Sequence, residues 1–212
     1  MRIILSDLDG VLADSTGEAC RRLWLWFSKL MTPDDVCEWD LGRVFTRLND
    51  LPYGQIDKFL REQCWEHALF YHDVVPYWSV WKTYLRLLKM EDTKLIFVTA
   101  RATYGEETDA IRRETQLWLN RYGFAECDVQ YLAGPSRIDW VLQDRGDAQV
   151  TYIDDKAETV RELLAQRPPA SLVQPFLLNR PWNRPRFGVP DDCIVQRINE
   201  STLSFILFGD NG

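Results

Sequence analysis

Two acidic residues stand one position apart at the end of a short apolar run near the N-terminus. The run covers residues 3–5, and Asp7, Asp9 and Gly10 follow it closely. In an extended strand alternate side chains share a face, so Asp7 and Asp9 should converge where the strand stops, and Gly10 lets the chain turn away. Two carboxylates so placed can hold Mg²⁺, and one of them can attack an electrophile. Taken alone, the segment could also be an acidic turn after an edge strand, because Asp and Gly are common in turns.

Three further polar groups lie next to later apolar runs. Thr99-Ala100-Arg101 comes after one such run, Asp154-Asp155 comes after another, and Arg137 opens a helix-like segment before the second of them. In open α/β sheets ligands bind beyond the carboxyl ends of the strands, so these side chains should meet at one edge of the sheet. The expected site therefore combines two acid pairs, a hydroxyl group and a cation.

Strand-like and helix-like patterns alternate along most of the chain. The expected strands cover residues 3–5, 94–99, 129–132, 150–153 and 175–178, and the expected helices between the later strands cover residues 106–121 and 157–165. Alternation of this kind predicts an α/β fold with a parallel sheet and helices on both faces.

One interval breaks this alternation. Residues 17–78 contain helical patterns and many aromatic residues but no convincing strand. Helices are expected at residues 18–30, 56–65 and 77–90, the last leading back into the sheet, and an irregular loop is expected at residues 179–190. We therefore expect a small helical cap at residues 17–78, inserted into a core made of residues 1–16 and 79–212.

The order acid pair, hydroxyl, cation, acid pair resembles the four motifs of the haloacid dehalogenase (HAD) superfamily, and the resemblance covers the whole sheet domain. It implies a Rossmann-like core in which Asp7 attacks phosphorus to form an aspartyl phosphate, while Asp9 protonates the leaving group and then activates water. It also implies Mg²⁺ bound by Asp7, the backbone carbonyl of Asp9 and Asp154. Thr99 and a cation would hold the remaining phosphate oxygens, and Asp155 would orient the site or the metal waters.

The cation departs from the HAD pattern. The superfamily usually has a lysine at this position, but no lysine lies between Lys94 and Lys156. Arg137 is the expected substitute and Arg145 is its rival, while either could be an ordinary surface arginine. An arginine can clamp phosphate through two N–H groups, but it is bulkier than lysine and cannot relay protons.

Residues outside the sheet motifs indicate the substrate. Trp39-Asp40-Leu41, Phe70-Tyr71 and the segment 179–184 (Asn-Arg-Pro-Trp-Asn-Arg) resemble the 5'(3')-deoxyribonucleotidase family of HAD phosphatases. The resemblance implies a nucleoside monophosphate substrate, with Phe70 and Tyr71 stacking on the base and Ala100-Arg101 also contacting the substrate. Either aromatic residue could instead belong to the core of the cap. The base, the sugar and the choice between 5' and 3' phosphate stay open.

Two other functions compete with this prediction. Thr99-Ala100-Arg101 followed by residues 112–115 and Trp118 is similar to the phosphatase domain of polynucleotide kinase, which removes terminal 3'-phosphates. Nucleic-acid ends are therefore a second candidate substrate, although the acidic chain and aromatic cap favour a mononucleotide. A catalytically silent HAD-fold binding protein is the third candidate. The missing lysine supports it, and the retained acid pairs oppose it.

Composition limits the remaining possibilities. The net charge of −7 and the isoelectric point near 4.9 argue against a chain-wide affinity for nucleic acid. Five widely spaced cysteines without a Cys-x-x-Cys pair predict neither a disulfide framework nor a zinc site, and only two histidines make a histidine metal site improbable. The start of the chain and the lack of long apolar runs predict a cytoplasmic protein without a membrane segment. The sequence leaves the oligomeric state open.

Overall fold

A computed structural model of the protein describes residues 1–103, 105–167, 172–183, 188–199 and 202. Within these residues six strands form one parallel sheet in the order β3-β2-β1-β4-β5-β6. Their bounds are β1 Arg2–Ser6, β2 Thr93–Thr99, β3 Asp128–Tyr131, β4 Gln149–Asp154, β5 Val173–Leu178 and β6 Ile194–Val195. The predicted α/β fold is confirmed, and five strands lie close to their predicted positions. The edge strand β6 is not predicted, because two residues are too few to form an alternating pattern.

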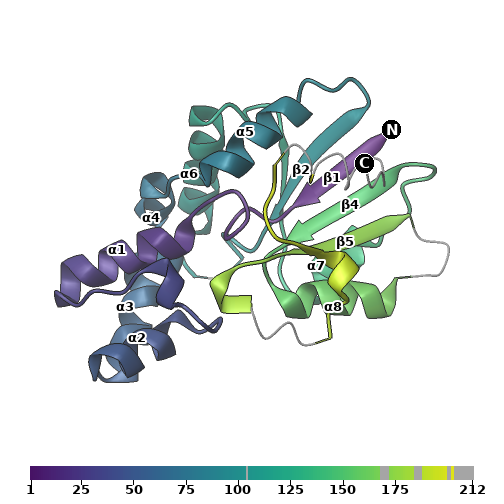
Figure 1. Cartoon of the computed structure of the whole chain (residues 1–212). Coiled ribbons are helices and arrows are strands. Elements are labelled where there is room, and N and C mark those ends of the chain that lie inside the picture. Colours follow the sequence, from purple (N-terminus) through teal and green to yellow (C-terminus); the bar gives the residue numbers. More distant parts are fainter. Residues whose placement is uncertain (104, 168–171, 184–187, 200–201, 203–212) are drawn as a thin grey trace.

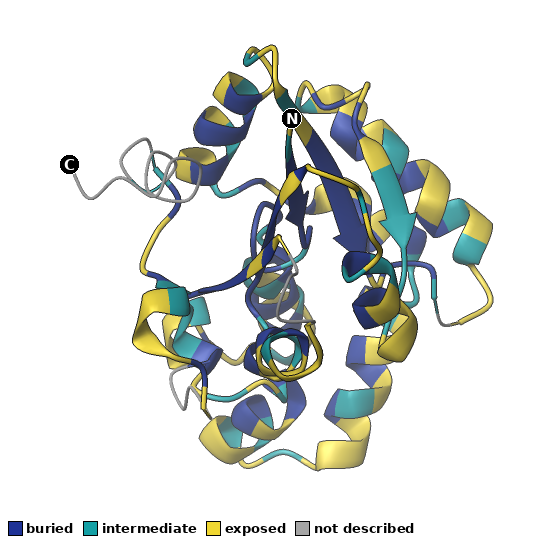
Figure 2. Cartoon of the chain, turned by 90° about the vertical axis from the view of Figure 1, so that its right-hand side faces the viewer, coloured by how far each residue is buried: buried dark blue, intermediate teal, exposed yellow. Residues whose placement is uncertain are grey.

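Helices cover both faces of this sheet (Figure 1). α5 (Trp78–Leu87) and α6 (Thr108–Arg121) pack on one face, whereas α7 (Pro135–Val141) and α8 (Ala157–Gln166) pack on the other. The alternation of side chains along β1 divides the core in two. Ile4 belongs to the cluster on the α5 and α6 side, and its neighbours Ile3 and Leu5 belong to the cluster on the α7 and α8 side. Figure 2 shows the central strands as buried along most of their length.

The segment between β1 and α5 is helical. It contains α1 (Ser15–Phe27), α2 (Leu41–Asn49), α3 (Tyr53–Leu60) and α4 (Ala68–Asp73), with a π-helical turn directly after α3. No strand forms between residues 17 and 78, all of which the structure describes. The sequence predicts α1, α3 and α5 to within a few residues, but it does not predict α2 or α4. We use the name cap for residues 17–78 below.

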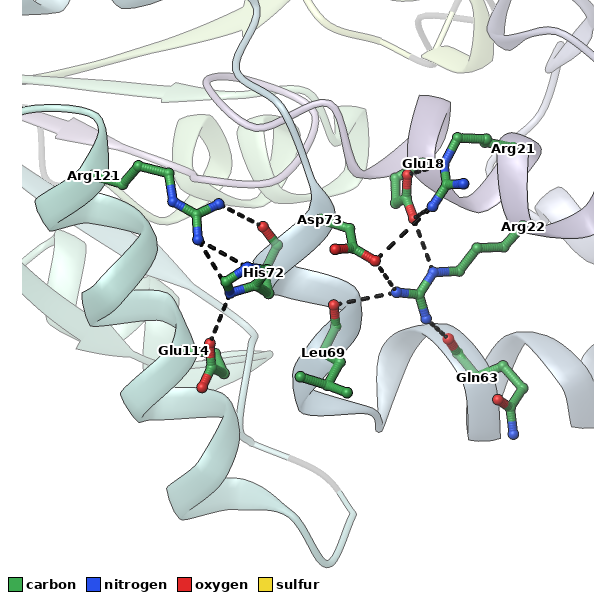
Figure 3. A network of polar contacts seen from close by, with 9 residues as sticks. All are labelled: Glu18, Arg21, Arg22, Gln63, Leu69, His72, Asp73, Glu114 and Arg121. Atoms are coloured by element: carbon green, nitrogen blue, oxygen red, sulfur yellow. Dashed lines mark hydrogen bonds and ion pairs between the residues drawn. The ribbon is translucent and has the colours of Figure 1, made fainter.

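The last helix of the cap is fixed to a core helix (Figure 3). Nη1 of Arg121 on α6 donates a hydrogen bond to the carbonyl oxygen of His72 at 2.9 Å, and Nδ1 of His72 lies 3.3 Å from Oε2 of Glu114. On the other side of α4, Nη2 of Arg22 on α1 pairs with Oδ2 of Asp73 at 2.9 Å. These contacts join α1, α4 and α6 to one another. None of the described helices is long and apolar enough to cross a membrane.

Candidate active site

Three carboxylates meet at the carboxyl ends of β1 and β4. The parallel register pairs Ser6 with Ile153, so the residues that follow them, Asp7 and Asp154, emerge side by side. One carboxylate oxygen from each of Asp7, Asp154 and Asp155 lies within 4.8 Å of the others, and all three residues are buried. We call these three residues the carboxylate cluster. The side chain of Asp9 is half-buried and lies outside the cluster.

Arg137 on α7 reaches into this cluster. Its Nη1 lies 3.2 Å from Oδ2 of Asp7 and 3.2 Å from Oδ2 of Asp154, and its Nε donates to the carbonyl oxygen of Leu132 at 3.1 Å. The residue is only 6% exposed. The structure therefore brings the predicted cation next to the predicted nucleophile.

Arg145 occupies a different place. Its guanidinium donates to the carbonyl oxygens of Val141 and Gln143 at 2.9 Å and of Trp140 at 2.8 Å, and it stacks on the ring of Trp140. The carbonyls of Trp140 and Val141 end α7, and that of Gln143 lies just beyond the helix. Arg145 is thus a helix-capping residue and not part of the site.

The cluster carries more negative charge than Arg137 can balance. Burial raises the pKa of Asp7 to about 7; Arg137 opposes this shift, and Asp154 and Asp9 add to it. Burial, followed by the charges of Asp154 and Asp7, also raises the pKa of Asp155 well above its usual range. Oδ1 of Asp155 is buried and has no hydrogen-bond partner among the described residues. Hard carboxylate oxygens with surplus negative charge and an unpaired oxygen fit a divalent cation.

Asp9 is held by an arginine that follows the neighbouring strand β2. Nε and Nη2 of Arg101 donate to Oδ2 and Oδ1 of Asp9 at 2.8 and 2.7 Å. The guanidinium is 4.3 Å from the centre of the Tyr71 ring, and its Nη1 is buried without a hydrogen-bond partner among the described residues. The sequence predicts Arg101 as a substrate contact but not as the partner of Asp9. No local signal could have revealed a pair formed by residues 92 positions apart.

Thr99 ends β2 next to this pair, and Ala100 follows it. Thr99 is fully buried, and its Oγ1 accepts a hydrogen bond from the backbone N–H of Arg101 at 3.2 Å. Ala100 is exposed and lines the cavity described next, whereas Thr99 is not among the lining residues. The predicted hydroxyl therefore lies at the expected strand end, directly behind the surface of the site.

A cavity of about 710 Å³ opens between the strand ends and the cap. Asp7, Asp9, Arg137 and Asp155 lie on its wall on the core side. On the cap side the wall carries three aromatic residues, which are Trp39, Trp65 and Tyr71. A volume of this size is typical of sites that enclose a small organic molecule.

The two aromatic residues predicted to face a base differ in position. Tyr71 lines the cavity, but Phe70 does not and is fully buried, with its ring packed edge-on against Trp65 and Tyr71. The base contact predicted for Phe70 does not fit this position, because adjacent helical residues point in different directions. Trp39, which is 51% exposed, faces the cavity instead, with Nζ of Lys156 5.5 Å from the centre of its ring.

The chain was compared with known proteins. No protein-family model matches the sequence, and none of the curated proteins matches it. Among solved structures it is similar to a haloacid dehalogenase-like hydrolase from Streptococcus pneumoniae, with 16% identity and a TM-score of 0.53 over 84% of this chain and 85% of that one. It is also similar to a HAD-superfamily hydrolase of subfamily IA from Geobacter sulfurreducens, with 13% identity and a TM-score of 0.55 over 93% and 92%. The chain has the fold of the HAD-superfamily hydrolases.

Proposed function

We propose that the protein is a Mg²⁺-dependent phosphatase that hydrolyses nucleoside monophosphates through an aspartyl phosphate on Asp7. The observation that carries the proposal is the convergence of Asp7, Asp154 and Asp155 with Arg137 at the carboxyl ends of β1 and β4. The HAD fold supports a hydrolase, and the positions of these residues supply a nucleophile, a cation and a place for a metal ion.

The proposed reaction assigns each side chain one task. Asp7 attacks phosphorus, and Arg137 holds phosphate oxygens. Thr99 supports the site from behind the cavity wall, where its Oγ1 accepts a hydrogen bond from the backbone N–H of Arg101. Asp9 gives a proton to the leaving oxygen and later takes one from the attacking water, with Arg101 fixing its orientation through two hydrogen bonds. When bound, Mg²⁺ neutralises phosphate charge and helps to orient the phosphoryl group.

These donors suit Mg²⁺. In the proposal its ligands are the carboxylates of Asp7 and Asp154 and the backbone carbonyl of Asp9, all of which are hard oxygens. Asp155 lies near enough to bind the metal or one of its waters.

The cavity supports a nucleoside monophosphate as the substrate. Its aromatic wall offers faces on which a base can stack, with Trp39 and Tyr71 as the contacting residues, and Ala100 lines the same cavity just after β2.

Charge favours a mononucleotide over the end of a nucleic acid. Besides the charged residues already placed in the site, the cavity wall carries five carboxylates and two basic residues, namely Asp40, Asp57, Glu66, Glu158, Glu162, Arg61 and Lys156. Such a wall repels the additional phosphates of a polymer, which a polynucleotide 3'-phosphatase must accommodate.

We further propose a cytoplasmic location, because all five cysteines are free, as is usual in a reducing compartment.

The test is phosphate release from a panel of nucleoside 5'- and 3'-monophosphates, 3'-phosphorylated oligonucleotides and a base-free phosphate ester, with and without Mg²⁺. The proposal predicts Mg²⁺-dependent release with a preference for mononucleotides. A preference for oligonucleotides with a steep salt dependence would instead support the 3'-phosphatase. Release from none of the compounds, by a protein that still binds Mg²⁺, would support the catalytically silent protein.

A further inference from the structure

A short segment after β5 holds both acidic loops of the site. We call residues 179–183 the strap; they include a 3-10 turn at Pro181–Asn183 within the predicted loop. Nε of Arg180 donates to the carbonyl oxygen of Gly10 at 2.7 Å, next to the first acid pair. Nδ2 of Asn183 donates to the carbonyl oxygen of Asp155 at 2.8 Å. Arg184 of the motif that resembles nucleotidases lies outside the described residues.

The strap also binds the side chain of Asp155. Nε1 of Trp182 donates to Oδ2 of Asp155 at 2.8 Å, in a contact where Trp182 is 6% exposed and Asp155 is 1% exposed. On the other side, the missing side chain of Gly10 makes room for the carboxylate. A Cβ atom at Gly10 would lie 1.9 Å from Oδ2 of Asp155, and the residue has φ +72°. Asp155 is therefore fixed between an indole N–H and a glycine backbone.

This arrangement leaves one oxygen of Asp155 for another purpose. Oδ2 is hydrogen-bonded, whereas Oδ1 is buried without a partner among the described residues. An unpaired acceptor at this depth is unfavourable unless a ligand satisfies it. The same carboxylate belongs to the cluster with Asp7 and Asp154, where a metal ion is the ligand that fits.

We propose that Trp182 is a positioning residue of the metal site, which holds Asp155 through Oδ2 so that Oδ1 faces the metal or a water bound to it. The inference rests on the proposed function only in assuming that the carboxylate cluster binds a divalent cation. The indole N–H limits rotation of the carboxylate and stabilises its ionised form. Partners of this kind behind metal-binding residues typically contribute 10- to 100-fold in metal affinity.

The test measures metal binding directly. Mn²⁺ is titrated into metal-free protein by calorimetry, for the wild type and for Trp182→Phe, which keeps an aromatic ring but removes the N–H donor. We expect the dissociation constant of the variant to rise by about 10- to 100-fold. Trp81→Phe is the matched control, because Nε1 of Trp81 makes an equivalent hydrogen bond of 2.9 Å to the carbonyl oxygen of Tyr122, which is not among the residues lining the cavity. Its Mn²⁺ affinity should equal that of the wild type.

A double-mutant cycle separates positioning from a general structural effect. If Trp182 acts through Asp155, Trp182→Phe should cause no further loss of Mn²⁺ affinity in an Asp155→Asn background. An unchanged affinity in the single variant, or an equal loss in both backgrounds, would overturn the inference. Should Trp182→Phe fail to fold, Gly10→Ala displaces the same carboxylate with the indole intact, and unchanged Mn²⁺ affinity there would also overturn it. Mn²⁺ binding that depends on Trp182 without any phosphate release would contradict the proposed function alone.

Discussion

Removing the charge of Arg137 should destabilise the metal-free protein and nearly abolish turnover. Its guanidinium is the basic group placed between Asp7 and Asp154, and it is 6% exposed. Removing one partner of a buried ion pair typically costs about 3–5 kcal/mol. We therefore expect Arg137→Met to lower the free energy of unfolding by about 3–5 kcal/mol at alkaline pH. Loss of a group that stabilises transition-state charge should lower kcat by about 10²- to 10³-fold.

The assay is urea unfolding of metal-free protein at acidic and alkaline pH, together with steady-state kinetics. The loss of stability should be smaller at acidic pH, because protonation of Asp7 and Asp155 then removes the uncompensated charge. Arg137→Lys, which keeps a positive charge at this position, should retain most of the stability and activity. Arg145→Met is the control and should lose only about 1 kcal/mol for its carbonyl contacts, with normal turnover. The reasoning would be refuted if Arg137→Met were as stable as the wild type at alkaline pH. It would also be refuted if Arg137→Met and Arg145→Met had equal effects on stability and turnover.

Three more predictions concern the same site. Asp7→Asn should reduce turnover to less than about a hundredth without lowering the metal-free stability, and higher residual activity would exclude Asp7 as the nucleophile. Since folding raises the pKa of Asp7 from 3.8 to about 7, the folded state binds more protons in this range. The free energy of unfolding of metal-free protein should therefore fall as the pH rises from about 4 to about 7, and urea unfolding that shows a rise would contradict this. Trp39→Ala should raise KM for a nucleoside monophosphate by the equivalent of about 1–3 kcal/mol, because the base loses a ring on which to stack. Trp24, which is 49% exposed and is not among the residues lining the cavity, serves as the control. An equal rise in KM for Trp24→Ala would argue against stacking on Trp39.

The sequence predicts the sheet and the acid pairs because both depend on local patterns. Apolar runs of strand length locate β1, β2 and β4, and the edge rule of open α/β sheets then brings Asp7 and Asp154 together. The same rule places Arg137 near them, since α7 begins at the same edge of the sheet. These relations follow from strand direction and side-chain alternation.

The remaining features depend on contacts between distant segments. The pairing of Arg101 with Asp9 and the hydrogen bond from Trp182 to Asp155 join residues that no periodic pattern relates. Phe70 is predicted to face a base but packs in the cap, because the direction of a side chain on a short helix is set by tertiary packing. α4 itself covers only six residues, which is too short for a clear helical period.

The most direct test of the proposed mechanism is to trap the phosphorylated protein. A radiolabelled phosphate monoester that the protein hydrolyses is mixed with it in the presence of Mg²⁺, the reaction is stopped with acid during the first turnover, and the labelled peptide is identified. The mechanism predicts label on the peptide containing Asp7 and none in Asp7→Asn. Label on a different residue, or rapid hydrolysis with no labelled protein at any time during the first turnover, would contradict it.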